Sequence, residues 1–252
     1  MRIGENTIIL EEIGSTNDYA KALAAEGASH GTVVWAKRQI AGKGTHGRSF
    51  ISIEGNVFYS VIIRPKDIGI AISRRLVYIN ALAVCGAMEK CIDKGKDSGV
   101  KLKWPNDILL EGKKVGGSLL ESDASGDCVI MGTGINIVAS PSADPTMIYP
   151  ASSLKECGYD VNRENIIKEL HARLNVEIDF FLANGFSKLR DRYLEKAFML
   201  NEEISIGNSP DKSDYVKGIY RGIDDNGFLL LERGGKTEAF FSGTVIRPAS
   251  QP

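Results

Sequence analysis

Three glycines in the first fifth of the chain, in the pattern Gly42-x-Gly44-x-x-Gly47, match the letters of the dinucleotide-binding fingerprint. That fingerprint holds a pyrophosphate only where a strand precedes it, a helix begins at its last glycine, and an acidic residue follows about 20 positions later. Residues 32–40 have the composition of a strand, but 49–63 also read as a strand, and the chain is apolar around position 62, where the acid is required. The pattern therefore excludes a Rossmann fold and predicts a glycine-rich loop between two strands.

This loop also carries Lys43, His46 and Arg48. Glycines let several backbone N–H groups point toward one anion at little steric cost, so the loop is suited to a phosphate. A solvated hairpin loop is the alternative, and the glycine pattern alone does not decide between the two.

Length and charge narrow the class of protein. The 252 residues can form one large domain, or a main domain with a small appendage. Lys and Arg total 31 against 32 Asp and Glu, so the formal net charge is −1 and no global basic footprint for DNA exists, although a local basic site is possible. No apolar run has membrane-spanning length and the first residues lack a signal peptide, so we expect a cytoplasmic protein without membrane contact.

The four cysteines and three histidines do not indicate a metal or redox centre. No CxxC pair occurs, and the histidines lie far apart in the sequence. We therefore expect no protein-bound metal, and we expect reduced, mostly buried thiols. A nucleophilic Cys–His pair made from distant positions stays open.

Hydrophobic periodicity predicts both helices and strands. Ser15 caps a first helix that ends before Gly27, a second helix is expected over about 70–94, and an amphipathic third helix over 162–185. Strands are expected at 7–12, 32–40, 49–63, 100–122 and 128–137, where 100–122 holds two or three strands interrupted at Pro105. This pattern predicts an α+β fold, with a mixed or antiparallel sheet and packed helices.

Beyond about Lys196 the sequence changes to short strands at close spacing, and DDNG at 224–227 is a hairpin signal. This change predicts a small all-β barrel. We therefore expect two domains, a ligand-binding domain over 1–197 and a C-terminal β-barrel over 198–252.

Four stretches place small and polar residues where packing alone would favour apolar ones. Each has an ordinary structural explanation when taken singly: a helix cap, a loop, a kinked strand with its hairpin, and a turn. The stretches lie at 15–17, at 39–48, at 103–107 together with 113–117, and at 132–136.

Taken together, GKGTHGR, KWPND followed by KKVGG, and GTGINI resemble the biotin protein ligases in order and approximate spacing, and YRGIDDNGFLLLE is similar to the C-terminal domain of that family. The resemblance extends over essentially the whole chain. It implies a catalytic domain like that of class II aminoacyl-tRNA synthetases and an SH3-like C-terminal barrel. Because the chain starts at the first strand of the catalytic domain, it resembles the class without an N-terminal DNA-binding domain, and we expect no DNA partner.

The resemblance implies a two-step reaction. Biotin and ATP, the latter with Mg²⁺, give biotinyl-5′-AMP, and biotin then passes to a lysine of the biotin carboxyl carrier domain of a biotin-dependent carboxylase. The first step joins two anions, so it needs positive charge and backbone N–H groups more than an enzyme nucleophile. A homodimer is possible.

The resemblance also assigns roles by position. The expected catalytic residues are Lys103, which would bridge the biotin carboxylate and the α-phosphate, and Arg48, which would contact phosphate. The residues expected to bind biotin are Ser15, Thr16, Asn17, Gln39, Lys43, Gly44, Thr45, Lys114 and Gly117. The residues expected to bind ATP or the adenylate are Arg48, Phe50, Lys103, Asn106 and Asn136. Trp104 is expected to pack in the core, on the face of its strand opposite Lys103.

Two positions depart from the family pattern. Thr45 stands where an arginine is usual, and Phe50 stands where a tryptophan commonly offers an aromatic face to adenine. A threonine does not reproduce a forked, charge-assisted contact, so we expect weaker retention of the adenylate.

Two alternatives remain at this stage. A lipoate or octanoate ligase of the same superfamily needs the same fold and the same activating lysine, and KWPND favours biotin over these acids. A non-enzymatic small-ligand or nucleic-acid binding protein would use the C-terminal barrel, but 199–252 has few interleaved aromatic and basic residues.

Overall fold

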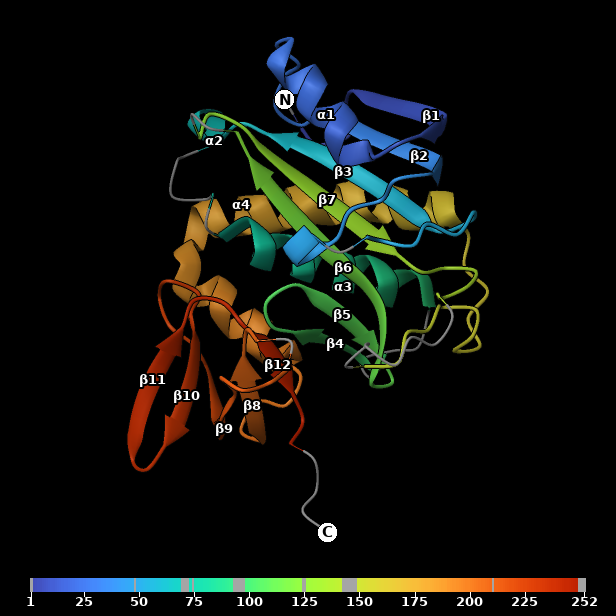
Figure 1. Ribbon diagram of the computed structural model, residues 1–252. Helices are drawn as coiled ribbons and strands as arrows, with labels where there is room; N and C mark the ends of the chain where they lie inside the picture. Colours follow the sequence, from blue (N-terminus) through green and yellow to red (C-terminus); the bar gives the residue numbers. More distant parts are fainter. Residues whose placement is uncertain are drawn as a thin grey trace.

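Two β-sheets and the helices packed on the larger sheet form the molecule (Figure 1). The computed structural model describes residues 2–47, 49–68, 73, 75–92, 98–123, 126–141, 149–209 and 211–248. Among these residues, no helix is both long and apolar enough to cross a membrane.

The central sheet has seven strands in the order β1-β2-β3-β7-β6-β5-β4. Of the described strand pairs in this sheet, β1–β2 is parallel and the others are antiparallel, so the sheet is mixed, as the sequence predicts. Its strands are β1 (Thr7–Ile13), β2 (Val33–Gln39), β3 (Val57–Ile63), β4 (Val100–Lys103), β5 (Asp107–Leu110), β6 (Lys113–Ser122) and β7 (Val129–Ile135).

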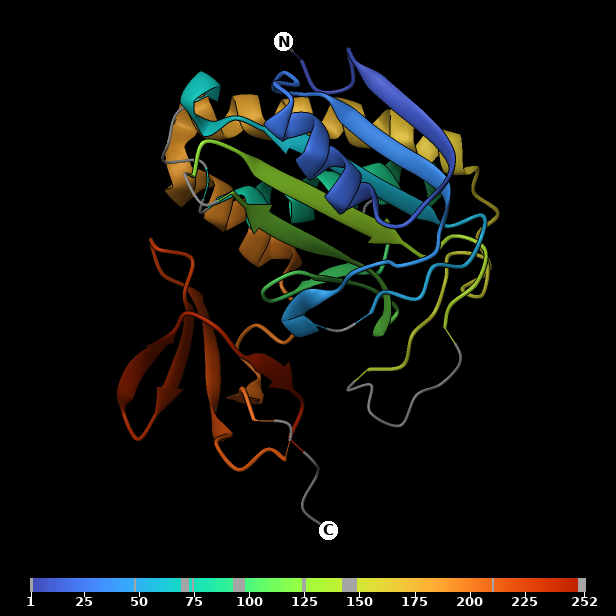
Figure 2. The same ribbon diagram turned by 45° about the horizontal axis from the view of Figure 1, so that its top comes forward.

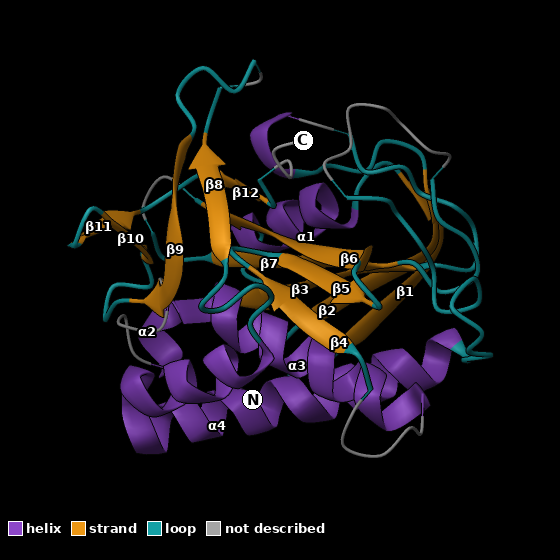
Figure 3. Cartoon of the chain, turned by 90° about the horizontal axis from the view of Figure 1, so that it is seen from below, coloured by secondary structure: helices purple, strands orange, loops and turns teal. Residues whose placement is uncertain are grey.

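Helices cover the two faces of this sheet unequally. The long helices α3 (Leu76–Ile92) and α4 (Arg163–Lys196) lie together on one face and enclose the main hydrophobic core (Figure 3). Helix α1 (Thr16–Ala25) packs on the opposite face over a smaller apolar cluster that includes Ala20, Val34 and Ile130. The rest of that second face is available for a site, because α1 covers only part of it. The described residues also include two short helical turns, α2 (Pro65–Ile68) and η1 (Thr45–Gly47).

The first two helices follow the predicted signals. Ser15 is the N-cap of α1, with its side chain accepting a hydrogen bond from the Asp18 N–H, as the capping pattern predicts. Helix α3 begins at Leu76 rather than near position 70, after the separate turn α2, and residues 93 and 94 at its expected end lie outside the described residues. Residues 69–72 and 74, where the earlier start was expected, lie outside the described residues.

The third predicted helix is longer than the periodicity indicates. Helix α4 continues past the expected end at Gly185, which has φ 76° and ψ 178° and divides it into two helical segments. This conformation changes the direction of the chain, so that Arg192 reaches back to Glu177 with a 2.7 Å ion pair. The second segment leads into the C-terminal sheet (Figure 2).

The C-terminal sheet is antiparallel, in the order β11-β10-β9-β8-β12. The predicted hairpin at 224–227 joins β9 to β10. Together with the central sheet, this small all-β unit confirms the predicted fold class, whereas the division at 197/198 stays a prediction. The strands are β8 (Glu203–Gly207), β9 (Val216–Ile223), β10 (Leu229–Arg233), β11 (Lys236–Phe240) and β12 (Thr244–Ile246).

We predict that Gly185→Ala destabilises the protein by about 1 to 3 kcal/mol, because its backbone region is essentially restricted to glycine. An added methyl group meets no atom within 4 Å, so the cost is backbone strain alone. Urea denaturation measures the free energy of unfolding. Gly14→Ala is the matched control, since it also has open space but no positive φ. Equal stabilities of the two variants would contradict this explanation.

Candidate active site

One row of paired residues crosses the central sheet on the face that carries α1. From β4 to β3 the row consists of Lys103, Asp107, Gly117, Gly134 and Phe58. Paired residues in adjacent strands point to the same side of a sheet, so Lys103 of β4, Asp107 of β5 and the glycines of β6 and β7 share one surface. The two central glycines leave the sheet without side chains at the middle of this row.

A buried carboxylate joins two lysines at the β4 end of the row. Asp107 lies 3.0 Å from the Lys103 Nζ and also pairs with Lys114. Burial by itself raises the pKa of Asp107, but the charges and hydrogen bonds of Lys103 and Lys114 outweigh burial and lower the pKa to about 2. The group carries two positive charges and one negative charge, so it retains a net positive charge for an anionic ligand.

Lys103 is held more tightly than a surface lysine. Its residue exposure is 6%, and its Nζ lies 5.0 Å from the centre of the Tyr149 ring, a cation–π contact. Trp104 is 3% exposed and its indole hydrogen-bonds to Tyr78 of α3 on the other face of the sheet. The expected opposition of Lys103 and Trp104 is therefore confirmed.

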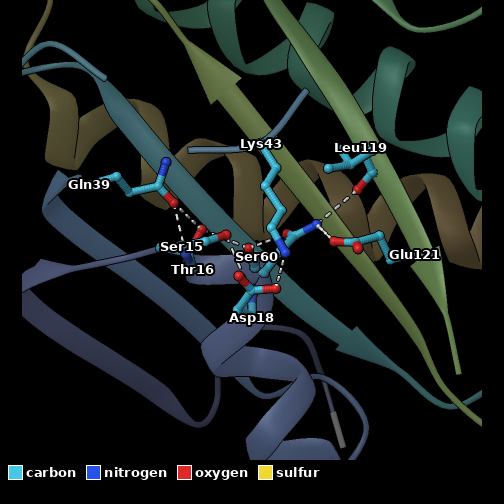
Figure 4. A network of polar contacts seen from close by, with 9 residues as sticks. Ser15, Thr16, Asp18, Gln39, Lys43, Ser60, Leu119 and Glu121 are labelled. Carbon is cyan, nitrogen blue, oxygen red and sulfur yellow. Dashed lines mark hydrogen bonds and ion pairs between the residues drawn. The ribbon is translucent and has the colours of Figure 1, made fainter. Parts of the chain in front are cut away.

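A second polar cluster lies at the N-terminus of α1 (Figure 4). The Thr16 N–H and hydroxyl both donate to Gln39 Oε1, at 2.7 and 3.0 Å. Ser60 of β3 contacts Thr16 Oγ1 at 2.8 Å and Asn17 Oδ1 at 2.6 Å, and Asn17 Nδ2 donates to Glu121 at 2.8 Å. Ser15, Thr16, Asn17, Gln39 and Ser60 are all buried, so these hydrogen bonds fix the directions of the side chains in a low-dielectric setting.

Lys43 reaches this cluster from the glycine-rich loop. Its ammonium group pairs with Asp18 in the first turn of α1, and this hydrogen bond is the main cause of its raised pKa (Figure 4). About half of each side chain is exposed, so the pair contributes little to stability. It does bring the loop over the site, where Gly44 and Thr45 are half-buried. Arg48, the predicted phosphate contact, lies outside the described residues.

The glycines of β7 connect the two clusters. Asn17 lies directly against Gly132, and the Phe50 ring lies directly against Gly134, so a Cβ atom at either glycine would collide with these side chains. Phe50 also makes an edge contact with Phe58, with 6.4 Å between ring centroids. The strand thus lies between the α1 cluster and the lysine group, with the aromatic ring from the loop on the same surface.

The two asparagines predicted to contact adenosine already have partners within the protein. The Asn106 Nδ2 donates to the Ser118 carbonyl at 2.7 Å, and the Asn136 Nδ2 donates to the Ser152 carbonyl at 3.0 Å. Asn56 in turn donates to the Asn136 Oδ1 at 3.4 Å. These bonds hold the loops after β4 and β7 in place, and the adenosine contacts stay predictions.

Sequence reasoning missed three polar residues of the site. Asp107 lies within the KWPND segment, so its spacing from Lys103 was available as a signal. Ser60 lies in the middle of the apolar strand β3 and Glu121 lies near the end of β6, and only the pairing of these strands with β7 shows that they face Asn17.

The described residues contain no group of three or more His, Cys, Asp or Glu side chains that could hold a metal ion. Asp107 does not suit a cation, since two lysines already neutralise it. The cysteines are free thiols, of which Cys85 and Cys128 are buried and Cys91 and Cys157 half-buried.

Family models agree with this geometry. Residues 9–136 match the Biotin/lipoate A/B protein ligase family, and residues 200–247 match the biotin protein ligase C-terminal domain. The chain belongs to the biotin protein ligase family. The first match begins within β1 and extends through β7, with every described residue of the predicted site, and the second covers the C-terminal sheet.

Relatives and solved structures of the family align over almost the whole chain. A biotin–[acetyl-CoA-carboxylase] ligase of Paracoccus denitrificans is 35% identical over 251 residues, covering 93% of this chain and 100% of that protein. The ligase of the same name from Mycobacterium tuberculosis is 32% identical, with 94% and 87% covered. The biotin protein ligase from Aquifex aeolicus in complex with biotin and ATP superimposes with a TM-score of 0.81 at 26% identity, covering 96% and 99%.

We predict that Asp107→Asn lowers the free energy of unfolding at neutral pH by about 2 kcal/mol. Because the pKa of Asp107 falls from 3.8 to about 2, its ionised form stabilises the wild type above about pH 4. This contribution is lost as the pH falls from about 5 through the folded-state pKa near 2, so the difference between variant and wild type should narrow over that range in urea denaturation.

Asp179→Asn is the control, because the exposed ion pair of Asp179 with Arg2 contributes little. A difference between wild type and Asp107→Asn that stays constant with pH would contradict the proposed charge coupling.

Proposed function

We propose that this protein is an ATP-dependent biotin protein ligase, and its family membership together with the Lys103–Asp107–Lys114 group carries the proposal. A biotin carboxylate oxygen attacks the α-phosphorus of ATP, the bond to the β-phosphate breaks, and pyrophosphate leaves. The amine of a carrier lysine then attacks the acyl carbon of biotinyl-5′-AMP. It forms an amide, loses a proton and releases AMP.

The first step brings a carboxylate against a phosphate, and Lys103 is suited to offset that repulsion. Its ammonium group is buried and oriented before substrates arrive, so little reorganisation is needed as charge develops. Asp107 holds Lys103 and Lys114 in the absence of an anion. On this proposal the substrate anions compete with Asp107 for the two ammonium groups.

Biotin would lie with its ureido end at the α1 cluster and its carboxylate toward Lys103. The hydroxyl and amide groups of Ser15, Thr16, Asn17 and Gln39 provide hydrogen-bonding partners for a neutral head group. Mg²⁺ would arrive on the ATP phosphates and keep part of its water shell, since Asp107 is already neutralised by lysines. It would neutralise charge on the departing pyrophosphate.

The acceptor is a biotin carboxyl carrier domain of a biotin-dependent carboxylase, no DNA contact is invoked, and a homodimer is to be tested by sedimentation. Four free thiols, two of them buried, are consistent with a reducing compartment such as the cytoplasm.

A lipoate or octanoate ligase is the second candidate, because the matched family includes lipoate ligases. ATP–pyrophosphate exchange with biotin, lipoate and octanoate separates the two. Exchange with biotin and not with the other two acids is expected. Exchange with lipoate or octanoate alone would replace the proposed substrate, and a lack of exchange with all three would favour a binding protein.

We predict that Lys103→Ala reduces biotin-dependent exchange about 100- to 1000-fold while the protein remains folded, the usual loss when one preorganised electrostatic contact is removed. Lys101→Ala is the matched control, because Lys101 lies on the same strand and is exposed. The exchange rates and circular dichroism spectra are compared. Near-normal exchange in Lys103→Ala would reject the role of this lysine.

We predict that Thr45→Arg slows the release of biotinyl-5′-AMP by about 10- to 150-fold, since a hydrogen bond to a charged group contributes roughly 1.5 to 3 kcal/mol. The measurement is the dissociation rate of preformed adenylate in the absence of carrier. Thr45→Lys is informative as a control, because it adds charge without the forked geometry. If the wild type retains the adenylate as long as Thr45→Arg, the contact is already supplied by other residues.

A further inference from the structure

The turn at 224–227, which joins β9 to β10 of the C-terminal sheet, contacts the core next to Trp104. This contact lies on the face of the central sheet opposite the Lys103–Asp107–Lys114 group. The Trp104 indole Nε1 donates to the Tyr78 hydroxyl at 3.1 Å and to the Gly227 carbonyl at 3.3 Å. The Tyr78 hydroxyl in turn donates to the same Gly227 carbonyl. Tyr78 and Trp104 are 3% exposed, so these hydrogen bonds lie away from solvent.

The fit between Tyr78 and the turn depends on glycine. Gly227 has a φ of 82°, and a Cβ atom there would lie 2.7 Å from the Tyr78 ring. Arg75 donates to the Asn226 carbonyl at 2.9 Å, and Arg190 pairs with Asp225 at 2.7 Å, so contacts from α4 and from the residue before α3 hold the turn from outside. The turn is therefore docked in one position against α3 and α4.

The C-terminal end of β4 has a second contact with the C-terminal part of the chain. The Leu102 carbonyl accepts a hydrogen bond from the Phe198 N–H at 2.8 Å, next to the bridge between Leu102 and Ala197. Lys103 stands between Leu102 and Trp104. Its backbone is thus held on both sides by contacts that lead into the C-terminal sheet, while its side chain points to Asp107 on the other face.

We propose that Tyr78 and Gly227 are positioning residues for Lys103, through which the docked C-terminal turn sets the place of the ammonium group during adenylate formation. This inference rests on the proposed function. A small displacement of a catalytic group, on the order of 1 Å, can reduce a rate by about 100-fold, so the position of the strand end matters even though no substrate touches it.

The Tyr78 hydroxyl is suited to this role because it accepts from Trp104 and donates to Gly227 at the same time. Burial raises the pKa of Tyr78 to about 12, and the hydroxyl therefore keeps its proton at neutral pH. Tyr220 provides the contrast. It is 2% exposed, and its hydroxyl has no hydrogen-bond partner among the described residues.

The experiment compares Tyr78→Phe with Tyr220→Phe in the full chain. Each substitution removes one buried hydroxyl and keeps the ring, including the edge contact of Tyr78 with Tyr193 at 4.9 Å. Biotin-dependent ATP–pyrophosphate exchange gives kcat and KM, calorimetry gives biotin affinity, and thermal unfolding gives Tm. For Tyr78→Phe we expect kcat to fall by about tenfold or more, with biotin affinity within about twofold of wild type. Tyr220→Phe should keep the wild-type kcat.

Gly227→Ala is the second variant, because it displaces the turn without removing the Tyr78 hydroxyl, and it should lower kcat in the same way. The inference is overturned if Tyr78→Phe keeps kcat within about twofold of wild type, or if both tyrosine variants lose kcat and Tm equally. Absence of exchange in the wild type would instead reject the proposed function, so the two failures are distinguishable.

Discussion

A carboxylate buried between two lysines is the interaction on which the site depends. Asp107 offsets the desolvation cost of the Lys103 ammonium group, which is 6% exposed and would bear a large cost if it were buried without a partner. The arrangement also explains why KWPND is followed by KKVGG in the sequence. Lys103 and Asp107 face each other across the β4–β5 hairpin, and Lys114 arrives on the next strand from the same side. A site that binds anions can therefore be preformed without anions.

The glycines of β6 and β7 keep the surface beside the lysine group free of their own side chains. On the proposed function, biotin lies between the α1 cluster and the lysines, and a side chain in the middle of the row would occupy part of that surface. Gly117 and Gly134 remove that obstacle where the strands pair. The Phe50 ring rests on Gly134, which shows that the surface between the clusters accommodates a flat group. The charged group of Lys103, Asp107 and Lys114 and the glycines Gly117 and Gly134 thus belong to one arrangement.

Local signals in the sequence predict local structure well. The Ser15 cap, the alternation that separates Lys103 from Trp104, and the 224–227 turn all depend on neighbouring residues, and the structure confirms them. The glycine at 185 predicts a helix end where the structure has a kink, because glycine signals a break but does not indicate that a second helical segment continues beyond it. The partners of Asn106 and Asn136, the facing of Ser60 and Glu121, and the contact of Tyr78 with Gly227 depend on residues far apart in sequence, so no local pattern indicates them.

Sheet geometry further restricts the shape of a ligand that would contact both clusters, as the proposed function requires. Asn17 lies on Gly132 of β7, while Lys103 lies on β4, three strands away in the sheet order. Adjacent strands are about 4.8 Å apart, so the backbones of these two strands are separated by roughly 14 Å, less the reach of the lysine side chain across the surface.

A compact acid could not reach both clusters at once. An elongated molecule with a hydrogen-bonding head and an anionic tail could, and biotin has this form, with a ureido ring at one end and a carboxylate at the other. Lipoate and octanoate have the tail but no comparable polar head, so the buried amides and hydroxyls around Thr16 and Asn17 would gain nothing from them.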